Sequence, residues 1–384
     1  MDYEKTDILI IGGGVAGLSC AIGLKNESNL KIVLLEKYNE FGSKIKGEIV
    51  NQKSEIFKKI FNNKFPVNIR NVIFKTAKYY TPTTKKFAIR KFPFDTKIGI
   101  EYRKLIDELV KVLTQSDVDI RINSEVIELI EKNDKFIGVK YKDTNGIKEI
   151  YSKIIVCAAG IDFLSLCNRF TTPPKNICPA IKLNAENVDI PDQSQLEFFL
   201  LEIPSIIYLF PKSKTKAEIG IILWNDQVKN NEKFNLHEIL MEQINSHQIL
   251  KKRLANAKFI YYSKEKLPLG GPLKNLYFPN IFFIGDMAGH VGAIGGSGIV
   301  SSMSIGYYLG VYLKDLFNIK KDFTDNDFIK CQKLINKLNI TKWLKKEASN
   351  AKVMRNILYS TYPNKNFIDD IWDKFKYFIE SRGP

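Results

Sequence analysis

The stretch Asp7–Gly17, DILIIGGGVAG, decides the fold. Residues 7–11 predict a short buried strand, a glycine-rich turn follows, and residues 16–24 predict a helix. A second apolar run at residues 31–35 predicts the next strand. The chain therefore begins with a β-α-β unit.

The glycines of this unit have the spacing of a dinucleotide-binding turn. Gly12 makes the tight turn, Gly14 lets the backbone approach a pyrophosphate, and Gly17 lets the helix pack on the strand. The N-terminus of the helix adds N–H donors and a positive dipole end. Glu36 ends the second strand, where its carboxylate can accept both hydroxyls of an adenosine ribose.

Two further positions are expected beside this turn. Lys37 follows Glu36, and Gly160 ends the Ala-Ala-Gly turn after an apolar strand at residues 148–157. Both belong to the predicted cofactor site.

A late segment distinguishes flavin from nicotinamide. Residues 280–286, NIFFIGD, predict a buried strand that ends in Gly285 and Asp286, as in flavoproteins of this fold. Asp286 is expected to bind the ribityl chain of FAD. The helix that opens at residues 296–299, with Gly296, Gly298 and Ile299, would direct its positive end at the flavin ring and favour the reduced anion.

The segment Gly295–Leu313 has no charged side chain, so its length alone is compatible with a membrane span. Its many glycines and serines make it only weakly apolar. We interpret it as a helix packed inside the protein.

The remaining pattern predicts two lobes and a cap. Residues 99–113 predict a helix, residues 119–126 a strand, and residues 135–139 and 148–157 a hairpin. Beyond Asn176, alternating aromatic-rich strands predict an antiparallel substrate lobe, and from about Asp322 the chain is helical and basic. The expected division is a discontinuous FAD-binding domain (1–70, 95–175 and 275–320), an antiparallel-sheet domain (71–94 and 176–274) and a C-terminal helical cap (321–384).

Composition restricts the classes of partner. The 58 Lys and Arg residues against 42 Asp and Glu residues give a formal charge of +16, which favours anionic partners. The excess is dispersed and no nucleic-acid motif accompanies it, so a nucleic acid is not the expected partner. The 5 cysteines show no metal-binding or disulfide spacing, which predicts reduced cytoplasmic thiols and no metal.

Several motifs resemble those of the geranylgeranyl reductase family of flavoproteins. GDMAGHVGAIGGSGI at residues 285–299 is similar to the family's GDAAGFVNPLTGEGI, and PLGGP at 268–272 lies upstream of it. SIIYLFPK followed by KAEIGI resembles YxWxFPK and ANVGLG, and GSKIKGE at 42–48 takes the place of GRKxCGG. The resemblance spans residues 7 to about 310. It implies an α/β fold with a Rossmann-type FAD-binding lobe and an inserted antiparallel-sheet lobe, as in para-hydroxybenzoate hydroxylase.

The resemblance also implies FAD contacts residue by residue. The positions that match are Ala16, Glu36, Gly47, Glu48, Arg103, Val126, Asp286, Gly298 and Ile299. The alternative to an FAD contact for Arg103 is an exposed charge on a helix.

Departures from the family pattern fall at the substrate side. Lys46 replaces the family's cysteine, Tyr208 its tryptophan, and His290 a phenylalanine. These three polar residues are the candidate catalytic groups near the flavin, with His290 favoured as a lining residue over an acid.

The resemblance implies an FAD-dependent reductase that saturates the C=C bonds of prenyl chains in membrane lipid precursors, by hydride transfer from flavin N5. The alternative is a flavin monooxygenase or halogenase acting on an aromatic or other hydrophobic substrate. The absence of the Asp-Gly pair usual in hydroxylases, where this chain has Ala159 and Gly160, favours the reductase. A third reading, a non-enzymatic flavoprotein that binds nucleic acid, lacks a recognition element.

The expected partners follow from this reading. They are a hydrophobic isoprenoid or lipid substrate, an anionic membrane surface, and either ferredoxin or NAD(P)H as electron donor. The expected location is the cytoplasm, on the inner face of the membrane.

Overall fold

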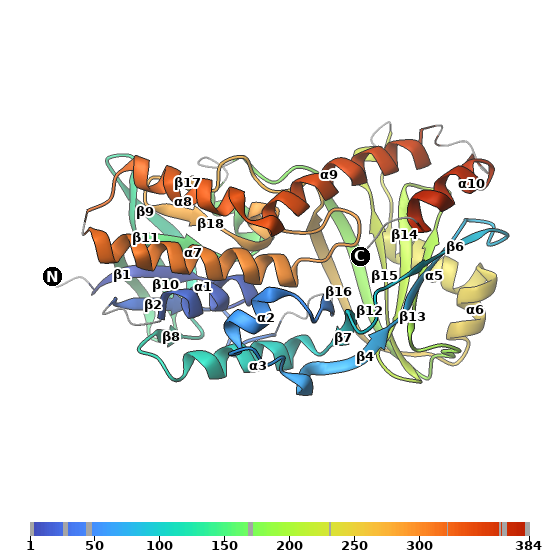
Figure 1. Ribbon diagram of the computed structural model, residues 1–384, viewed down its shortest axis with the longest axis horizontal. Coiled ribbons are helices and arrows are strands. Elements are labelled where there is room, and N and C mark those ends of the chain that lie inside the picture. Colours follow the sequence, from blue (N-terminus) through green and yellow to red (C-terminus); the bar gives the residue numbers. More distant parts are fainter. Residues whose placement is uncertain are drawn as a thin grey trace.

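The computed structural model describes residues 4–25, 30–43, 48–167, 172–229, 232–320, 322–360, 362 and 367–380. The molecule is elongated, with a lobe of helices on a largely parallel sheet at one end and a sheet lobe at the other (Figure 1). This arrangement confirms the α/β fold class with a second sheet lobe and C-terminal helices. The residue boundaries of the domains stay a prediction.

The first lobe is built on an eight-stranded sheet with the order β17-β18-β11-β1-β2-β8, to which β9 and β10 add beside β11. The strands are β1 (Glu4–Ile11), β2 (Ile32–Leu35), β8 (Asp119–Arg121), β9 (Glu125–Lys132), β10 (Lys135–Asp143), β11 (Gly146–Cys157), β17 (Tyr277–Phe278) and β18 (Ile281–Phe283). Strand β1 pairs in parallel with β2 and β11, and β11 in parallel with β18. The central strands are apolar on both faces because the sheet is covered on both sides.

Two glycine-containing helices pack unusually closely over this sheet. They are α1 (Val15–Lys25) and α7 (Ile299–Ile319). A Cβ atom on Gly306 would lie 2.2 Å from the carbonyl oxygen of Ala16, and one on Gly310 would lie 2.2 Å from that of Cys20. The glycines of α7 thus serve helix packing, which confirms the interpretation of a buried helix. In the described parts of the chain, every helix is too short or too polar to cross a bilayer.

The second lobe contains a seven-stranded sheet with the order β16-β12-β15-β14-β13-β5-β6. Its strands are β5 (Thr76–Tyr80), β6 (Phe87–Lys91), β12 (Ile177–Glu186), β13 (Gln195–Leu200), β14 (Ser205–Pro211), β15 (Lys216–Leu223) and β16 (Lys258–Pro268). The expected antiparallel sheet is found except at one pairing, because β13 and β5 run in parallel. Strands β5 and β6 enter as a hairpin from an earlier segment, so no tight turn constrains the direction of β5 against β13.

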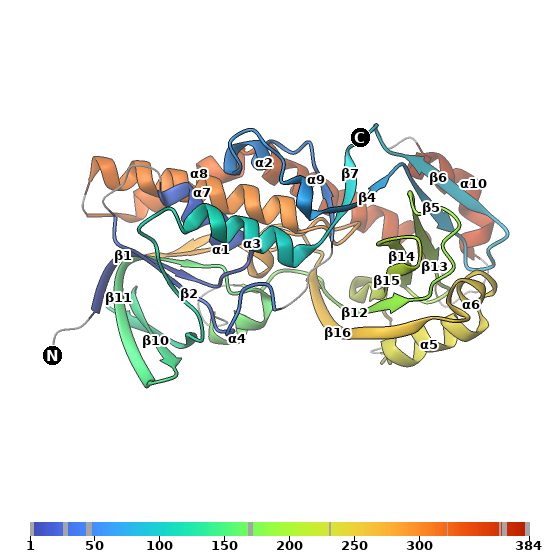
Figure 2. The same cartoon turned by 90° about the horizontal axis from the view of Figure 1, so that it is seen from below.

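The two faces of this sheet have different neighbours (Figure 2). On β14, Ile207 and Leu209 join a core beneath α5 (Leu236–Ser246) and α6 (Gln248–Leu254). The alternate residues Ile206, Tyr208 and Phe210 face a cavity between the lobes. Period-two alternation along the strand therefore separates a structural face from a functional one.

A small three-stranded sheet and short helices join the lobes. The strands are β3 (Ile49–Asn51), β7 (Lys97–Ile100) and β4 (Arg70–Phe74), and the helices are α2 (Glu55–Ile60), α3 (Tyr102–Leu113) and α4 (Leu164–Cys167). Residues 99–100, expected at the start of a helix, belong to β7 instead. The expected strand 119–126 is divided between β8 and β9, because Asn123 between them has a φ of +48° and ends the extended run.

Three C-terminal helices cover both lobes: α8 (Asp325–Lys337), α9 (Asn339–Leu358) and α10 (Phe367–Glu380). Helix α9 runs from the first lobe to the second, and α10 lies beside β6 (Figure 1). Thr83 Oγ1 donates a hydrogen bond of 2.7 Å to Asp369, and Lys86 pairs with Asp373 at 3.0 Å. The cap therefore closes the cavity from the side opposite α3.

Candidate cofactor site and adjoining cavity

A cavity of about 1100 Å³ extends from the glycine turn after β1 to the inner side of α10. Both lobes and the C-terminal helices line it. The predicted cofactor residues on its wall are Gly12, Gly14, Ala16, Glu36, Lys37, Glu48, Val126, Gly160, Gly285, Asp286, Gly296, Gly298 and Ile299.

A different steric requirement explains the absence of a side chain at each glycine of the first turn. Gly12 has a φ of +102°, and a Cβ on it would lie 2.7 Å from the carbonyl oxygen of Ala158 on the neighbouring strand. A Cβ on Gly17 would lie 2.0 Å from the carbonyl oxygen of Gly12, so Gly17 is required by helix packing behind the site. A Cβ on Gly14 would meet no atom within 4 Å. The protein itself leaves that space open on the cavity wall, where a diphosphate would need it.

Glu36 holds the shape of this turn. Its carboxylate accepts hydrogen bonds from the backbone N–H groups of Gly13, at 2.6 Å, and Tyr38, at 3.0 Å. A carboxylate can accept further hydrogen bonds at its remaining lone pairs. Glu36 therefore shapes the turn and still presents acceptor capacity to the cavity.

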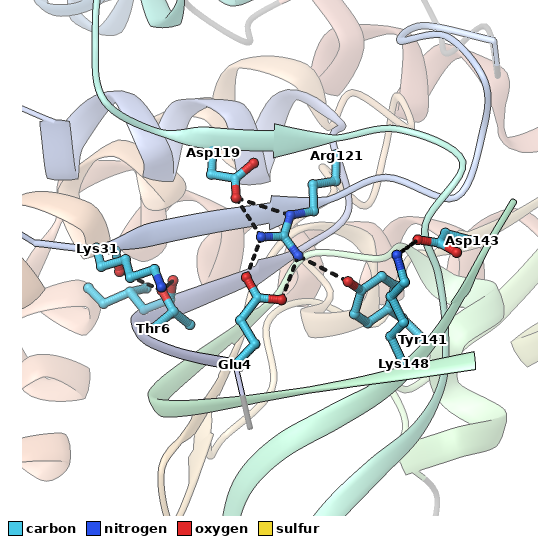
Figure 3. A network of polar contacts seen from close by, with 9 residues as sticks. Glu4, Thr6, Lys31, Asp119, Arg121, Tyr141, Asp143 and Lys148 are labelled. Carbon is cyan, nitrogen blue, oxygen red and sulfur yellow. Dashed lines mark hydrogen bonds and ion pairs between the residues drawn. The ribbon is translucent and has the colours of Figure 1, made fainter. Parts of the chain in front are cut away.

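An ion-pair network supports the strand next to Glu36 (Figure 3). Arg121 on β8 donates to Glu4 on β1 at 2.9 Å, to Asp119 at 2.6 Å and to the Tyr141 hydroxyl at 3.0 Å. The Arg121 guanidinium lowers the pKa of the Glu4 carboxyl. Since the carbonyl of Arg121 accepts the Glu36 N–H at 2.8 Å, the network holds the backbone at the adenosine end of the site.

The glycine-rich segment that begins at Gly285, late in the chain, packs against the start of α1. Gly285, with a φ of +75°, follows β18, and a Cβ on it would lie 3.2 Å from the Cβ of Ala16 on α1. Asp286 Oδ1 lies 3.5 Å from the position of a Cβ on Gly298, the residue before α7. The carboxylate and the N-terminus of a 21-residue helix thus lie together on the cavity wall.

Beyond α7 the cavity becomes apolar. A Cβ on Gly296 would lie 3.4 Å from Leu267 on β16 and 4.0 Å from Ile222 on β15. Further apolar lining residues come from β13, β14, the residue after β15, α9 and α10: Leu200, Ile206, Trp224, Met354, Leu358, Phe375 and Ile379. A long hydrophobic molecule could lie there with one end near the start of α7.

Polar side chains also line the cavity, among them Arg90, Lys97, Glu265 and Glu347. One polar cluster lies on β12, β14 and β15. The Tyr208 hydroxyl donates to Glu218 Oε1 at 3.1 Å, and Lys182 Nζ lies 3.3 Å from Glu218 Oε2. Burial, together with the Glu218 carboxylate, raises the pKa of Tyr208. Burial also raises the pKa of Glu218 against the opposing effect of the lysines.

Comparisons with known proteins agree with this geometry. A family model described as pyridine nucleotide-disulphide oxidoreductase matches residues 6–165. The digeranylgeranylglycerophospholipid reductase of Methanococcus vannielii is 26% identical over 313 residues, which cover 80% of this chain and 76% of the relative. That of Thermoplasma acidophilum is 26% identical over 369 residues, 90% of this chain and 87% of the relative.

Solved structures give the same fold. A geranylgeranyl bacteriochlorophyll reductase-like protein from Thermoplasma acidophilum superposes with a TM-score of 0.83 at 22% identity, covering 100% of this chain and 93% of that one. The flavin-dependent brominase Bmp2 superposes with a TM-score of 0.72 at 16% identity, covering 98% and 93%.

The chain is an FAD-dependent oxidoreductase that resembles the digeranylgeranylglycerophospholipid reductases. The open space at Gly14, the acceptor Glu36 and the Asp286–α7 junction all fit a flavin dinucleotide. Gly12 to Glu36 would hold its adenosine and diphosphate, and Asp286 with α7 would hold its flavin half.

His290 of this oxidoreductase lies behind the site. It is fully buried, is absent from the cavity wall, and accepts the N–H of Gly285 on Nδ1 at 3.1 Å. Burial lowers the pKa of His290 to about 3, so the ring is neutral. This position favours a role in holding the Gly285–Asp286 turn, and its predicted catalytic role has no geometric support here.

The remaining predicted residues lie at the edge of the cavity or outside the described part of the chain. Glu48 accepts the N–H of Tyr102 at 2.9 Å and pairs with Lys212. Arg103 has 54% of its side chain exposed and pairs with Glu40. Its position on α3 is that of the alternative, a surface charge. Lys46 and Gly47 lie outside the described residues.

No sequence motif or spacing pointed to Arg355 on α9. Its side chain is buried, pairs with Asp226 at 2.8 Å, and donates to the carbonyl of Ala293 at 3.2 Å. Ala293 belongs to the loop that leads into α7. Arg355 therefore ties the C-terminal cap to the flavin end of the oxidoreductase through contacts between residues far apart in the chain.

Proposed function

We propose that this protein is a reductase that uses FAD to saturate the C=C bonds of prenyl chains in membrane lipid precursors. The observation that supports it is the apolar extension of the cavity, which continues from the Asp286–α7 junction to Phe375 and Ile379 on α10. An isolated alkene offers no polar handle, so its binding depends on burial of apolar surface. The names of the curated relatives indicate a lipid of this class.

The two ends of the site are proposed to bind different parts of the cofactor. Gly12 and Gly14 receive the diphosphate at the N-terminus of α1, and Glu36 accepts the ribose hydroxyls. Asp286 receives the ribityl chain, and the N-terminus of α7 stabilises negative charge on the ring. When bound, the reduced flavin supplies a hydride equivalent.

The residues of this chain would supply the rest of the reaction. The apolar walls exclude water and orient the prenyl chain. Tyr208 is one polar group on the wall with a transferable proton, which its hydroxyl donates to Glu218 in the resting structure. The electron donor is ferredoxin or NAD(P)H, and the basic surface would favour an acidic protein donor.

Anaerobic turnover tests the proposal. The photoreduced protein is mixed without oxygen with a digeranylgeranyl lipid, a quinone or an aromatic acid. The expected result is flavin reoxidation by the prenyl lipid with a product mass gain in steps of two hydrogens. Reoxidation only by oxygen, with hydroxylation or halogenation of an aromatic compound, would show that the protein shares the chemistry of the brominase as well as its fold.

A further inference from the structure

Tyr208, Glu218 and Lys182 form a buried polar cluster on the cavity wall, beside the apolar residues Ile206 and Ile222. The side chains of Lys182 and Glu218 are 4% and 2% exposed. Taking both charges out of water has a large desolvation cost, and a well-packed apolar pair would often serve stability as well. The pair therefore calls for an explanation beyond packing.

The geometry directs the cluster at the cavity through Tyr208. Tyr208 lies opposite Gly220 on the neighbouring strand, and a Cβ on Gly220 would lie 2.4 Å from the Tyr208 hydroxyl oxygen. The absence of that Cβ lets the ring lie across β15 and reach Glu218. Lys182 approaches the same carboxylate from the other side, and Lys212 lies 3.9 Å from it.

The cluster also lies close to the flavin end of the cavity. Ile222, Gly220 and Glu218 alternate along one face of β15, and Ile222 contacts the position of a Cβ on Gly296 at 4.0 Å. Alternate residues on a strand are about 7 Å apart. Tyr208, which lies over Gly220, is therefore between the start of α7 and the buried Glu218.

We propose that Glu218 and Lys182 are positioning residues that return a proton to Tyr208 after Tyr208 protonates the substrate. The inference rests on the proposed function. One alkene carbon would receive the hydride equivalent that the two-electron-reduced flavin supplies when bound. The Tyr208 hydroxyl would turn from Glu218 to the other carbon and give up its proton as the O–H bond breaks. The phenolate then takes the proton that Lys182 passes through the Glu218 carboxylate, and solvent restores the lysine ammonium. Two C–H bonds replace one C=C π bond, so electrons and protons balance.

The other face of the same sheet supplies a matched control. Tyr80 donates to Glu197 at 3.1 Å, and Arg253 lies 3.4 Å from that carboxylate. This trio has the same chemistry, but it is absent from the cavity wall. Tyr80→Phe therefore removes an equivalent hydroxyl from a structural pair.

The turnover arm compares Tyr208→Phe, Glu218→Gln and Tyr80→Phe as FAD-loaded proteins with a prenyl lipid. Removal of a general acid should lower the rate of reduction by about 10²- to 10⁴-fold in Tyr208→Phe. Glu218→Gln should lower kcat with little change in KM and should alter the pH profile, and Glu218→Asp should restore part of the rate. Tyr80→Phe should reduce the lipid at the rate of the parent protein.

A second arm needs no turnover. Tyrosine labelled with ¹³C at Cζ is titrated by NMR, and Tyr208 is assigned by the signal missing in Tyr208→Phe. Burial is the larger cause of the raised pKa of Tyr208 and the Glu218 carboxylate adds to it, so Glu218→Gln should lower the pKa of Tyr208 while burial keeps it above the ordinary value. Tyr80→Phe should leave the Tyr208 signal unmoved.

The outcomes separate the two proposals. If the parent protein reduces prenyl lipid and Tyr208→Phe does so equally fast, the proton route is wrong and the proposed function stands. An unchanged Tyr208 titration in Glu218→Gln would also overturn the route. If no prenyl lipid is reduced while the two residues titrate as a coupled pair, the proposed function fails and the Glu218–Tyr208 coupling is supported.

Discussion

At the residue scale, Gly14 and Gly17 have different tasks although they belong to the same motif. The space beside Gly14 is open within 4 Å, whereas that beside Gly17 is filled by the Gly12 carbonyl. Gly14→Ala should therefore leave the free energy of unfolding of the apoprotein within about 1 kcal/mol and weaken FAD binding at least tenfold. Gly17→Ala should destabilise the apoprotein itself, by about 2 kcal/mol or more. Urea unfolding and flavin fluorescence titration check both, and equal unfolding of the two variants would contradict the assignment.

His290 gives a pH-dependent prediction. Its pKa in the folded protein, about 3, lies below the ordinary value of 6.5, so folding favours the neutral ring. The stability that His290 contributes is complete above pH 6.5 and is lost as the pH falls toward 3, by about 1.4 kcal/mol per pH unit. His290→Asn keeps an acceptor for the Gly285 N–H and does not titrate. The unfolding free energy of the parent protein relative to this variant should fall between pH 7 and pH 5, and a constant difference would contradict burial of a neutral ring.

At the element scale, the local units of the first lobe could be predicted and their long-range pairings could not. The order strand, glycine turn, helix and strand is encoded within residues 4–35, so periodicity and the DILIIGGGVAG motif were sufficient. The parallel pairing of β13 with β5 depends on segments more than a hundred residues apart. The split between β8 and β9 depends on one positive φ at Asn123, which an apolar pattern does not reveal.

The same dependence on long-range contacts explains which residues of the site could be predicted from the sequence. The placement of Glu36 and Asp286 on the cavity wall could be predicted, because Glu36 directly follows β2 and Asp286 lies three residues after the end of β18. The contacts of Glu218, Lys182 and Arg355 come from separate elements that only the tertiary fold brings together. The family resemblance implied a cofactor contact for Arg103, but its side chain pairs with Glu40 on the surface.

Arg355 tests the link between α9 and the flavin loop. Arg355→Met keeps the length of the side chain and removes its hydrogen bonds to Asp226 and Ala293. Loss of a partner from a buried pair should lower the free energy of unfolding by about 2–4 kcal/mol. The Asp226 side chain is 24% exposed, which reduces the effect. Lys352→Met, at an exposed position of the same helix, is the control and should change stability by less than about 0.5 kcal/mol. Comparable unfolding curves for the two variants would show that α9 does not hold the loop.

At the scale of the whole molecule, α9 combines exposed basic and apolar side chains with the cavity wall. Trp343 is 42% exposed and also lines the cavity, as does Lys346. Val353 and Ile357 are exposed on the same helix. This surface would suit the approach of a lipid from a membrane with anionic headgroups.

Vesicle binding tests that surface. Reversing three exposed lysines of α9, Lys342→Glu, Lys346→Glu and Lys352→Glu, should weaken binding to anionic vesicles, because each lysine near such a surface contributes about 1 kcal/mol. The same reversal at Lys132, Lys135 and Lys142, on the β9–β10 hairpin of the first lobe, is the charge-matched control. Equal losses in the two triple variants, or binding that salt does not weaken, would contradict a specific docking face.

The central claim is that one dinucleotide joins the glycine turn after β1 to the Asp286–α7 junction. The most direct test is a titration of the apoprotein with FAD and, separately, with FMN, which lacks the adenosine half. If Gly12 to Glu36 bind that half, FAD should bind at least a hundredfold more tightly than FMN, and Glu36→Ala should remove most of the difference. A protein that takes up neither flavin, or binds both equally, would contradict the account.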